Sequence, residues 1–250
     1  MATGAAAFEI VPHRAIYKLD LASTSNPTAI SDVNGEMMFQ WSDSCDGWTV
    51  EQRYRMNFLD AEGAAVEQSS VYATWESKDG NAFTFSVRST TNGVVDKEVR
   101  GRATLDGEGR SGSVTFRLPE EVTQDLPPGT IFPTAHTLKM LEIAEAGDGP
   151  PFFNALLFDG SGLDSLREIN AVIGAGQTSA ENGRFDLLDR PFWPIELAFY
   201  PEERREAVPE YEMSVSLHDN GVINDMIIDY GTFAVSASLN MLEPIEDGGC

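Results

Sequence analysis

The chain contains few basic residues. Its 250 residues include 17 lysines and arginines against 40 aspartates and glutamates, which gives a formal net charge of -23. DNA, RNA or an anionic bilayer surface would be repelled over most of such a surface. We therefore expect no nucleic-acid partner, and we attribute the acidic surplus to solubility rather than to an acidic ligand site.

Long hydrophobic runs are also missing. No apolar segment approaches the roughly 20 residues that a transmembrane helix needs, so no transmembrane segment is expected. The amino end lacks the charged and apolar regions of a signal peptide, and Met1–Ala7 consists mostly of small residues. Such a tail is typical of a chain whose signal peptide has been removed and replaced by a start methionine. We predict that residues 1–7 are a disordered remnant and that residues 8–250 form a single domain.

Patterns for metals and nucleotide cofactors are scarce. The three histidines, His13, His136 and His218, are scattered along the chain, and neither cysteine has a partner at metal-ligand spacing. Gly174 and Gly176 imitate the start of a dinucleotide motif, but no third glycine and no strand-helix-strand repeat follow. We expect no metal and no cofactor.

A catalytic triad is a weak alternative. His136, Asp159 and Ser161 are the residue types that nucleophilic hydrolysis uses. Ser161 lies in Asp-Gly-Ser-Gly rather than in the Gly-x-Ser-x-Gly elbow, and such residues occur together in most chains of this length. We predict no catalytic residue, and a hydrolase that uses His136 and Ser161 is the less favoured alternative.

Only two cysteines are present, Cys45 and Cys250, and Cys250 is the last residue. A disulfide between them would close a loop over most of the chain and stabilise the fold by up to roughly 5 kcal/mol. Alternatively, Cys45 is a buried thiol and Cys250 belongs to a frayed end, as is usual in a cytosolic protein. We favour the disulfide, and the choice decides the compartment.

Turn signals and short alternating segments fill the chain. The alternation is clean at Phe83, Phe85 and Val87 and only approximate from Val50 to Phe58. We predict a dozen or more strands, including residues 193–200, 211–218, 222–230 and 232–239, in a sheet that must curl or close. The predicted tight turns are Asn34-Gly35, Asp46-Gly47, Asp79-Gly80, Asn92-Gly93, Asp106-Gly107, Asn182-Gly183 and Asn220-Gly221.

One segment, residues 133–146, has the pattern of a helix. Pro133 fits the first helical position, Gly147 fits the stop, and Leu138, Leu141 and Ile143 supply an apolar face. The rigid turn Leu126–Gly129 precedes it. The order of strands, one helix and strands again favours a curled sheet around a helix, although a boundary near 120–150 could instead separate two sandwiches.

Several blocks resemble the EipB family of periplasmic cell-envelope integrity proteins, long described as a domain of unknown function. The resemblance runs from about Pro12 to Cys250, and no single block decides it. The blocks are Cys45–Arg53, Trp75–Gly80 with Phe83–Phe85, Arg100–Ala103, Leu126–Thr137, Leu157–Ser161, Asn220-Gly221, Asp229–Gly231 and the closing Cys250.

The resemblance implies a mainly β, single-domain, broken and spiral-like antiparallel β-barrel of a dozen or more strands around one central helix. It implies a secreted Gram-negative periplasmic protein in which Cys45 and Cys250 form a disulfide. The similarity of that fold to lipoprotein carriers implies a cavity for an acyl chain or an apolar peptide. No catalytic residues are known for the family, so none are assigned here.

We therefore expect a non-enzymatic periplasmic protein that supports cell-envelope integrity by binding an apolar ligand or an envelope protein. The main alternative is a scaffolding protein without a ligand cavity. Aromatic side chains bear on this choice, because they either fill the core or leave space beside the helix. They are Trp41, Trp48, Trp75, Trp193, Phe132, Phe152, Phe153, Phe158 and Phe199.

Overall fold

The computed structural model describes residues 10–25, 29–147, 152–178, 185–201 and 208–246. Within these ranges the chain forms sixteen strands, one α-helix and one 3-10 helix. The strands are β1 (His13–Thr24), β2 (Asp32–Asp43), β3 (Gly47–Leu59), β4 (Ala65–Ser77), β5 (Ala82–Thr91), β6 (Val94–Leu105), β7 (Gly112–Leu118), β8 (Val122–Leu126), β9 (Thr130–Ile131), β10 (Phe152–Phe158), β11 (Leu166–Ile173), β12 (Gln177–Thr178), β13 (Pro191–Pro201), β14 (Tyr211–His218), β15 (Ile223–Asp229) and β16 (Phe233–Pro244). The helices are α1 (Pro133–Ala146) and η1 (Asp186–Leu188).

All of the strands belong to one sheet. Their order is β8-β7-β6-β5-β4-β3-β2-β1-β16-β15-β14-β13-β11-β10-β9, and β12 pairs with β13. Every pair is antiparallel except the parallel pair of β9 and β10. The first and last strands of the chain lie side by side, because β1 pairs with β16 along nearly its whole length.

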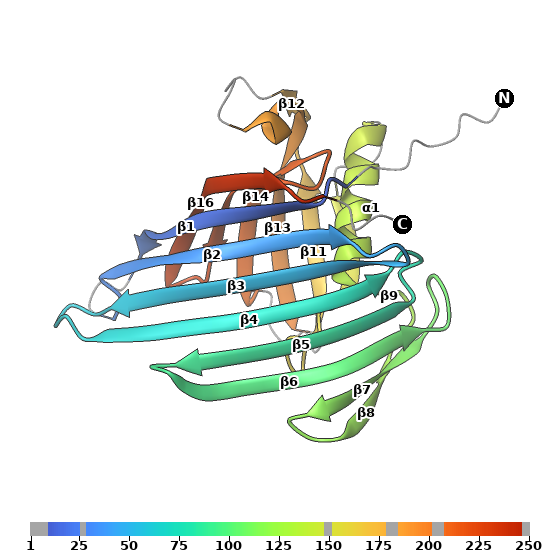
Figure 1. Ribbon diagram of the computed structural model, residues 1–250, viewed down its shortest axis with the longest axis horizontal. Helices are drawn as coiled ribbons and strands as arrows, with labels where there is room; N and C mark the ends of the chain where they lie inside the picture. Colours follow the sequence, from blue (N-terminus) through green and yellow to red (C-terminus); the bar gives the residue numbers. More distant parts are fainter. Residues whose placement is uncertain (1–9, 26–28, 148–151, 179–184, 202–207, 247–250) are drawn as a thin grey trace.

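The sheet curls into a barrel that does not close. In Figure 1, β1 to β6 form the front wall, and β11, β13 and β14 stand behind them. The two ends of the sheet, β8 and β9, are not paired with each other in the described ranges, so the barrel is broken there. The predicted broken β-barrel is confirmed.

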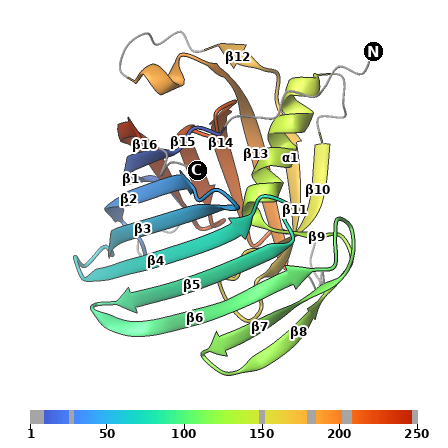
Figure 2. The same ribbon diagram turned by 45° about the vertical axis from the view of Figure 1, so that its right-hand side comes forward.

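Helix α1 has the predicted bounds. Pro133 lies at its start, and Gly147 ends it in the left-handed conformation with φ 67°. Figure 2 shows α1 between the front wall and the strands behind it, where it packs on β10 and β11. The apolar face is wider than Leu138, Leu141 and Ile143, of which only Leu141 is fully buried. The buried residues are Thr134, His136, Met140, Leu141 and Ala144.

The predicted turn at Asn34-Gly35 was wrong, because both residues lie inside β2, where Asn34 faces Asn57 of β3. Gly35 serves close packing instead, since a Cβ there would lie 2.3 Å from the carbonyl oxygen of Arg55. At Asp46-Gly47 the positive φ falls on Cys45, at 65°. Asn92-Gly93 is a tight turn with positive φ at both residues, and Gly80, Gly107 and Gly221 also have positive φ. Asn182-Gly183 lies outside the described residues.

The interior holds two hydrophobic clusters. The larger one lies inside the barrel and includes Trp41, Trp48, Trp193 and the buried face of α1. The smaller one lies near the broken edge and is built from phenylalanines of β5, β7 and β10 and the residue before α1. Its rings, which contact one another at centroid distances such as 5.0 Å for Phe83 and Phe132, are Phe83, Phe85, Phe116, Phe132 and Phe158.

Candidate ligand-binding site

One end of the barrel is lined by strand ends that do not fill the space between them. At this end β1, β3 and β15 finish, and β2, β4 and β16 begin. Because side chains alternate along a strand, every second residue of these ends points into the barrel.

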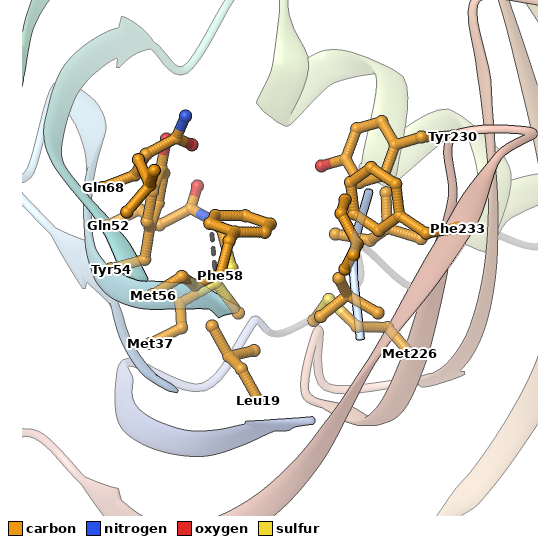
Figure 3. A pocket seen from close by; sticks show the side chains of 14 residues that line it. Leu19, Met37, Gln52, Tyr54, Met56, Phe58, Gln68, Met226, Tyr230 and Phe233 are labelled. Carbon is orange, nitrogen blue, oxygen red and sulfur yellow. Dashed lines mark hydrogen bonds between the residues drawn. The ribbon is translucent and has the colours of Figure 1, made fainter. Parts of the chain in front are cut away.

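A cavity of about 500 Å³ opens there. Figure 3 shows it between β1 to β4 on one side and β15 and β16 on the other. Its size lies within the range of roughly 300–1,000 Å³ that is usual for small-molecule sites. The lining residues are Leu19, Ile30, Met37, Gln52, Tyr54, Met56, Phe58, Val66, Gln68, Met226, Ile228, Tyr230, Phe233 and Val235.

The lining becomes more exposed from floor to mouth. Leu19, Met37 and Met226 on the floor are buried. At the mouth, Phe58 of β3 and Phe233 of β16 are half-buried and meet edge to face with ring centroids 6.0 Å apart. These two rings come from opposite sides of the cavity in Figure 3 and contact each other.

The polar groups of the lining carry no charge. Gln52 Nε2 donates to Met37 Sδ at 2.9 Å. Burial raises the pKa of Tyr54, and the nearby Asp96 carboxylate raises it further, against a hydrogen bond with Ser70 that lowers it. Burial also raises the pKa of Tyr230. Both phenols are therefore neutral hydrogen-bonding groups at ordinary pH.

At the opposite end of β4, Glu76 holds the helix in place. Its carboxylate accepts hydrogen bonds from the backbone amides of Thr134 at 2.8 Å and Ala135 at 2.7 Å. Residue Phe132 before the helix offers no side-chain cap, so Glu76 replaces it from another element. Burial raises the pKa of Glu76 to about 7, although the two amides lower it.

The three residues of the candidate triad do not form a hydrogen-bonded triad. His136 is buried in α1 and stacks on Phe153, and its Nε2 has no hydrogen-bond partner within the described part of the chain. Asp159 instead accepts a bond from the Ser161 amide at 2.8 Å, and its carbonyl accepts one from the Tyr72 hydroxyl. The Asp159–Ser161 segment therefore joins β10 to the front wall.

The other two histidines are also buried. His13 Nδ1 lies 2.8 Å from the Val11 carbonyl oxygen, and His218 packs beside Phe192. The described ranges contain no group of three or more histidine, cysteine, aspartate or glutamate side chains arranged to hold a metal ion. They also contain no helix with the length and apolar sequence that crossing a bilayer requires.

Only one of the two predicted disulfide partners, Cys45, lies among the described residues. Cys45 occupies the turn between β2 and β3, close to the end of the barrel that carries Glu76. Cys250 lies outside the described residues, so the pairing of the two cysteines stays a prediction.

Comparison with known proteins agrees with this architecture. A family profile described as EipB-like matches residues 4–246. The chain belongs to the EipB-like family. A cell envelope integrity protein EipB of Brucella abortus (strain 2308) is 32% identical, over 99% of this chain and 89% of its own length. The crystal structure of a beta-barrel-like protein of a domain of unknown function from Brucella abortus superposes with a TM-score of 0.87 at 30% identity, covering 96% of this chain and 100% of that one.

The cavity of this EipB-like protein was not located from sequence. The only signal was the approximate alternation in β3, where Gln52, Tyr54, Met56 and Phe58 occupy the inward positions. Two of these four are not β-branched or aromatic residues. Methionine is flexible, so it fills irregular gaps in cores and is also common on surfaces that adapt to different ligands.

Proposed function

We propose that this protein is a non-enzymatic, periplasmic protein that supports cell-envelope integrity by holding an apolar ligand in its barrel. The observation that carries the proposal is the cavity of about 500 Å³, which is open at the barrel end and lined by uncharged, mostly apolar side chains. Burying apolar surface there would stabilise a complex by roughly 25 cal/mol per Å² before the costs of binding are subtracted. The Brucella abortus relative, a cell envelope integrity protein, supports the envelope role.

The cavity favours a ligand-binding protein over the scaffolding alternative, which expects a filled interior. Nε2 of the buried His136 has no hydrogen-bond partner among the described residues, which gives no support to the hydrolase alternative. Fractionation of the native host, with a tagged chain followed into the periplasmic fraction, tests the location separately.

Substitution of Val66 by tryptophan tests ligand binding. Val66 lines the mouth and is 40% exposed, so a larger ring can enter the cavity without disturbing the core. We expect Val66→Trp to weaken binding of the apolar dye Nile red at least about tenfold, the loss that about 1.4 kcal/mol of binding free energy represents. Fluorescence titration measures it.

Val71→Trp is the matched control. Val71 lies in the same strand, is 41% exposed and faces away from the cavity, since it stands an odd number of positions from Val66. Equal dye binding by the two variants, or no binding by the unmodified protein, would contradict the proposed function. Lipid extraction of protein purified from its native host, followed by mass spectrometry, then identifies the natural ligand.

A further inference from the structure

We propose that the cavity selects a single-chain amphiphile whose polar end carries no negative charge. This inference rests on the ligand-binding function proposed above and specifies its ligand class. A cavity of about 500 Å³ has the size for one ligand with a narrow apolar portion. The charge of the ligand follows from three features of the cavity: its lining, its mouth and its orientation.

Among the described residues, no cationic side chain lines the cavity. None of the fourteen described lining residues is a lysine, arginine or histidine. Arg55 belongs to the lining strand β3, but its side chain is on the outer face, where it forms an ion pair with Glu67. A carboxylate, sulfate or phosphate inside the cavity would therefore lose its hydration without gaining a charged partner, which is costly.

Several carboxylates lie at the end of the barrel where the cavity opens. Asp32 begins β2, Asp60 follows β3, and Asp229 ends β15 beside Tyr230. Asp96 of β6 lies near enough to raise the pKa of Tyr54. In the described part of the chain, none of these four has a cationic partner within 4.0 Å. The field at the mouth is therefore negative and repels an anionic head group.

The cavity also has a polar side and an apolar side. Figure 3 shows the Gln68 amide and the Tyr230 hydroxyl toward one side, with Leu19 and Met226 toward the other. Gln68 and Tyr230 are exposed, whereas Leu19 and Met226 are buried. An alkyl chain of the ligand that contacts Leu19 and Met226 would thus place the ligand's hydroxyl, ester or amide group beside Gln68 and Tyr230 at the mouth.

Three detergents with the same dodecyl chain test the selection below their micelle concentrations, with isothermal titration calorimetry as the measurement. They are dodecyl sulfate, dodecyl maltoside and dodecyltrimethylammonium. A single charge about 10 Å away in water changes an affinity about twofold. With four carboxylates at the mouth and an ionic strength of about 0.01 M, we expect the sulfate to bind about tenfold more weakly than the maltoside. The trimethylammonium compound should bind at least as tightly as the maltoside.

Two charge-neutralising variants separate the mouth from the net charge. Asp60→Asn/Asp229→Asn keeps the Oδ1 atoms that accept backbone amides in these turns. Since it removes two mouth charges, it should bind dodecyl sulfate about fourfold more tightly than the unmodified protein. Asp106→Asn/Glu108→Gln changes the net charge equally in the turn after β6, at the other end of the barrel, and should change the affinity less than about twofold.

The outcomes distinguish the two proposals. If none of the detergents binds, or if Val66→Trp binds all of them as well as Val71→Trp does, the proposed function fails. If all three bind in the cavity and the sulfate binds as tightly as the maltoside, the ligand-binding function stands and the charge selection is overturned. Equal effects of the two charge variants would also overturn the role of the mouth.

Discussion

Glu76 places a titratable carboxyl group in the interior of the barrel, where a helix begins. Its two oxygens satisfy two amides that the start of α1 leaves without intrahelical partners. The side chain is only 2% exposed, so the hydrogen bonds compete with the cost of removing a carboxylate from water. The balance raises the pKa from 4.5 to about 7.

This shift gives a pH dependence of stability with a definite sign. Between about pH 4.5 and 7 the folded protein retains the Glu76 proton while the unfolded chain has lost it, so this contribution to the free energy of unfolding falls as pH rises. Between these two pH values the Glu76 contribution to the free energy of unfolding falls by about 3 kcal/mol in total. The Glu76→Gln variant should lack this pH-dependent contribution. The free energy of unfolding of the unmodified protein should therefore fall by about 3 kcal/mol relative to that of the variant between these pH values. Chemical denaturation at both pH values measures this difference.

Glu142→Gln is the control for this prediction, since Glu142 lies exposed on the same helix. The variant removes the same charge from an exposed position of the same helix. The interpretation fails if the two variants differ from the unmodified protein by the same amount at both pH values.

The buried His136 has the opposite effect on the pH dependence of stability. Burial lowers its pKa from 6.5 to about 4, so the unfolded chain binds a proton that the folded protein does not, and stability falls as pH decreases through this window. We expect His136→Leu to match the unmodified protein within about 1 kcal/mol at neutral pH, because the imidazole Nε2 makes no hydrogen bond with any described residue. At pH 5 the variant should be more stable by about 2 kcal/mol. Equal unfolding midpoints at pH 5 would refute this.

Gly160 fits a position where no side chain has room. It has φ 68°, and a Cβ would lie 2.4 Å from Phe85 Cγ in the phenylalanine cluster. We expect Gly160→Ala to lower the free energy of unfolding by about 3 kcal/mol, from the backbone and from overpacking together. Gly63→Ala, with φ 83° and no neighbour within 4 Å, should lose only about 1 kcal/mol. Urea denaturation compares the two, and equal losses would rule out the contact with Phe85.

At the scale of elements, local patterns predicted the helix and most strands. Pro133 and Gly147 favour the helix ends through their backbone geometry, which a sequence displays directly. Asn34-Gly35 has the same local chemistry as Asn92-Gly93, yet one lies in a strand and the other in a turn. The difference arises because Gly35 must let the Arg55 carbonyl approach, and that neighbour comes from another strand.

Local sequence patterns also failed to locate the candidate site, because its residues come from distant parts of the chain. The inward alternation of β3 was visible, but the cavity also needs Met226 and Phe233, which come from the far end of the chain. Their position depends on the pairing of β1 with β16. Glu76 was likewise unidentifiable as a helix cap, since the backbone amides that it accepts from lie 58 and 59 residues later in the chain.

At the scale of the whole molecule, the predicted disulfide would tie Cys45, in the turn between β2 and β3, to the carboxyl end. We expect reduction to increase the intact mass by two hydrogens. Cys45→Ser should lower the free energy of unfolding by up to about 5 kcal/mol, as loop closure predicts. Mass spectrometry with and without reductant, together with denaturant melts, measures both.

Cys250→Ser is the companion variant. If the two cysteines are paired, each single substitution and the double substitution should cost the same. Additive losses, or an unchanged mass on reduction, would show that the cysteines act independently.

The sequence by itself determined the charge, the strand content, the helix bounds and the family, because each of these depends on composition or on residues that are close along the chain. Tertiary structure alone decided where the sheet breaks, that β4 supplies the cap of α1, and that fourteen lining residues from β1 to β16 enclose a cavity. The physical reason is that a curled sheet brings residues such as Leu19 and Val235 together, and only the register of paired strands specifies which residues meet.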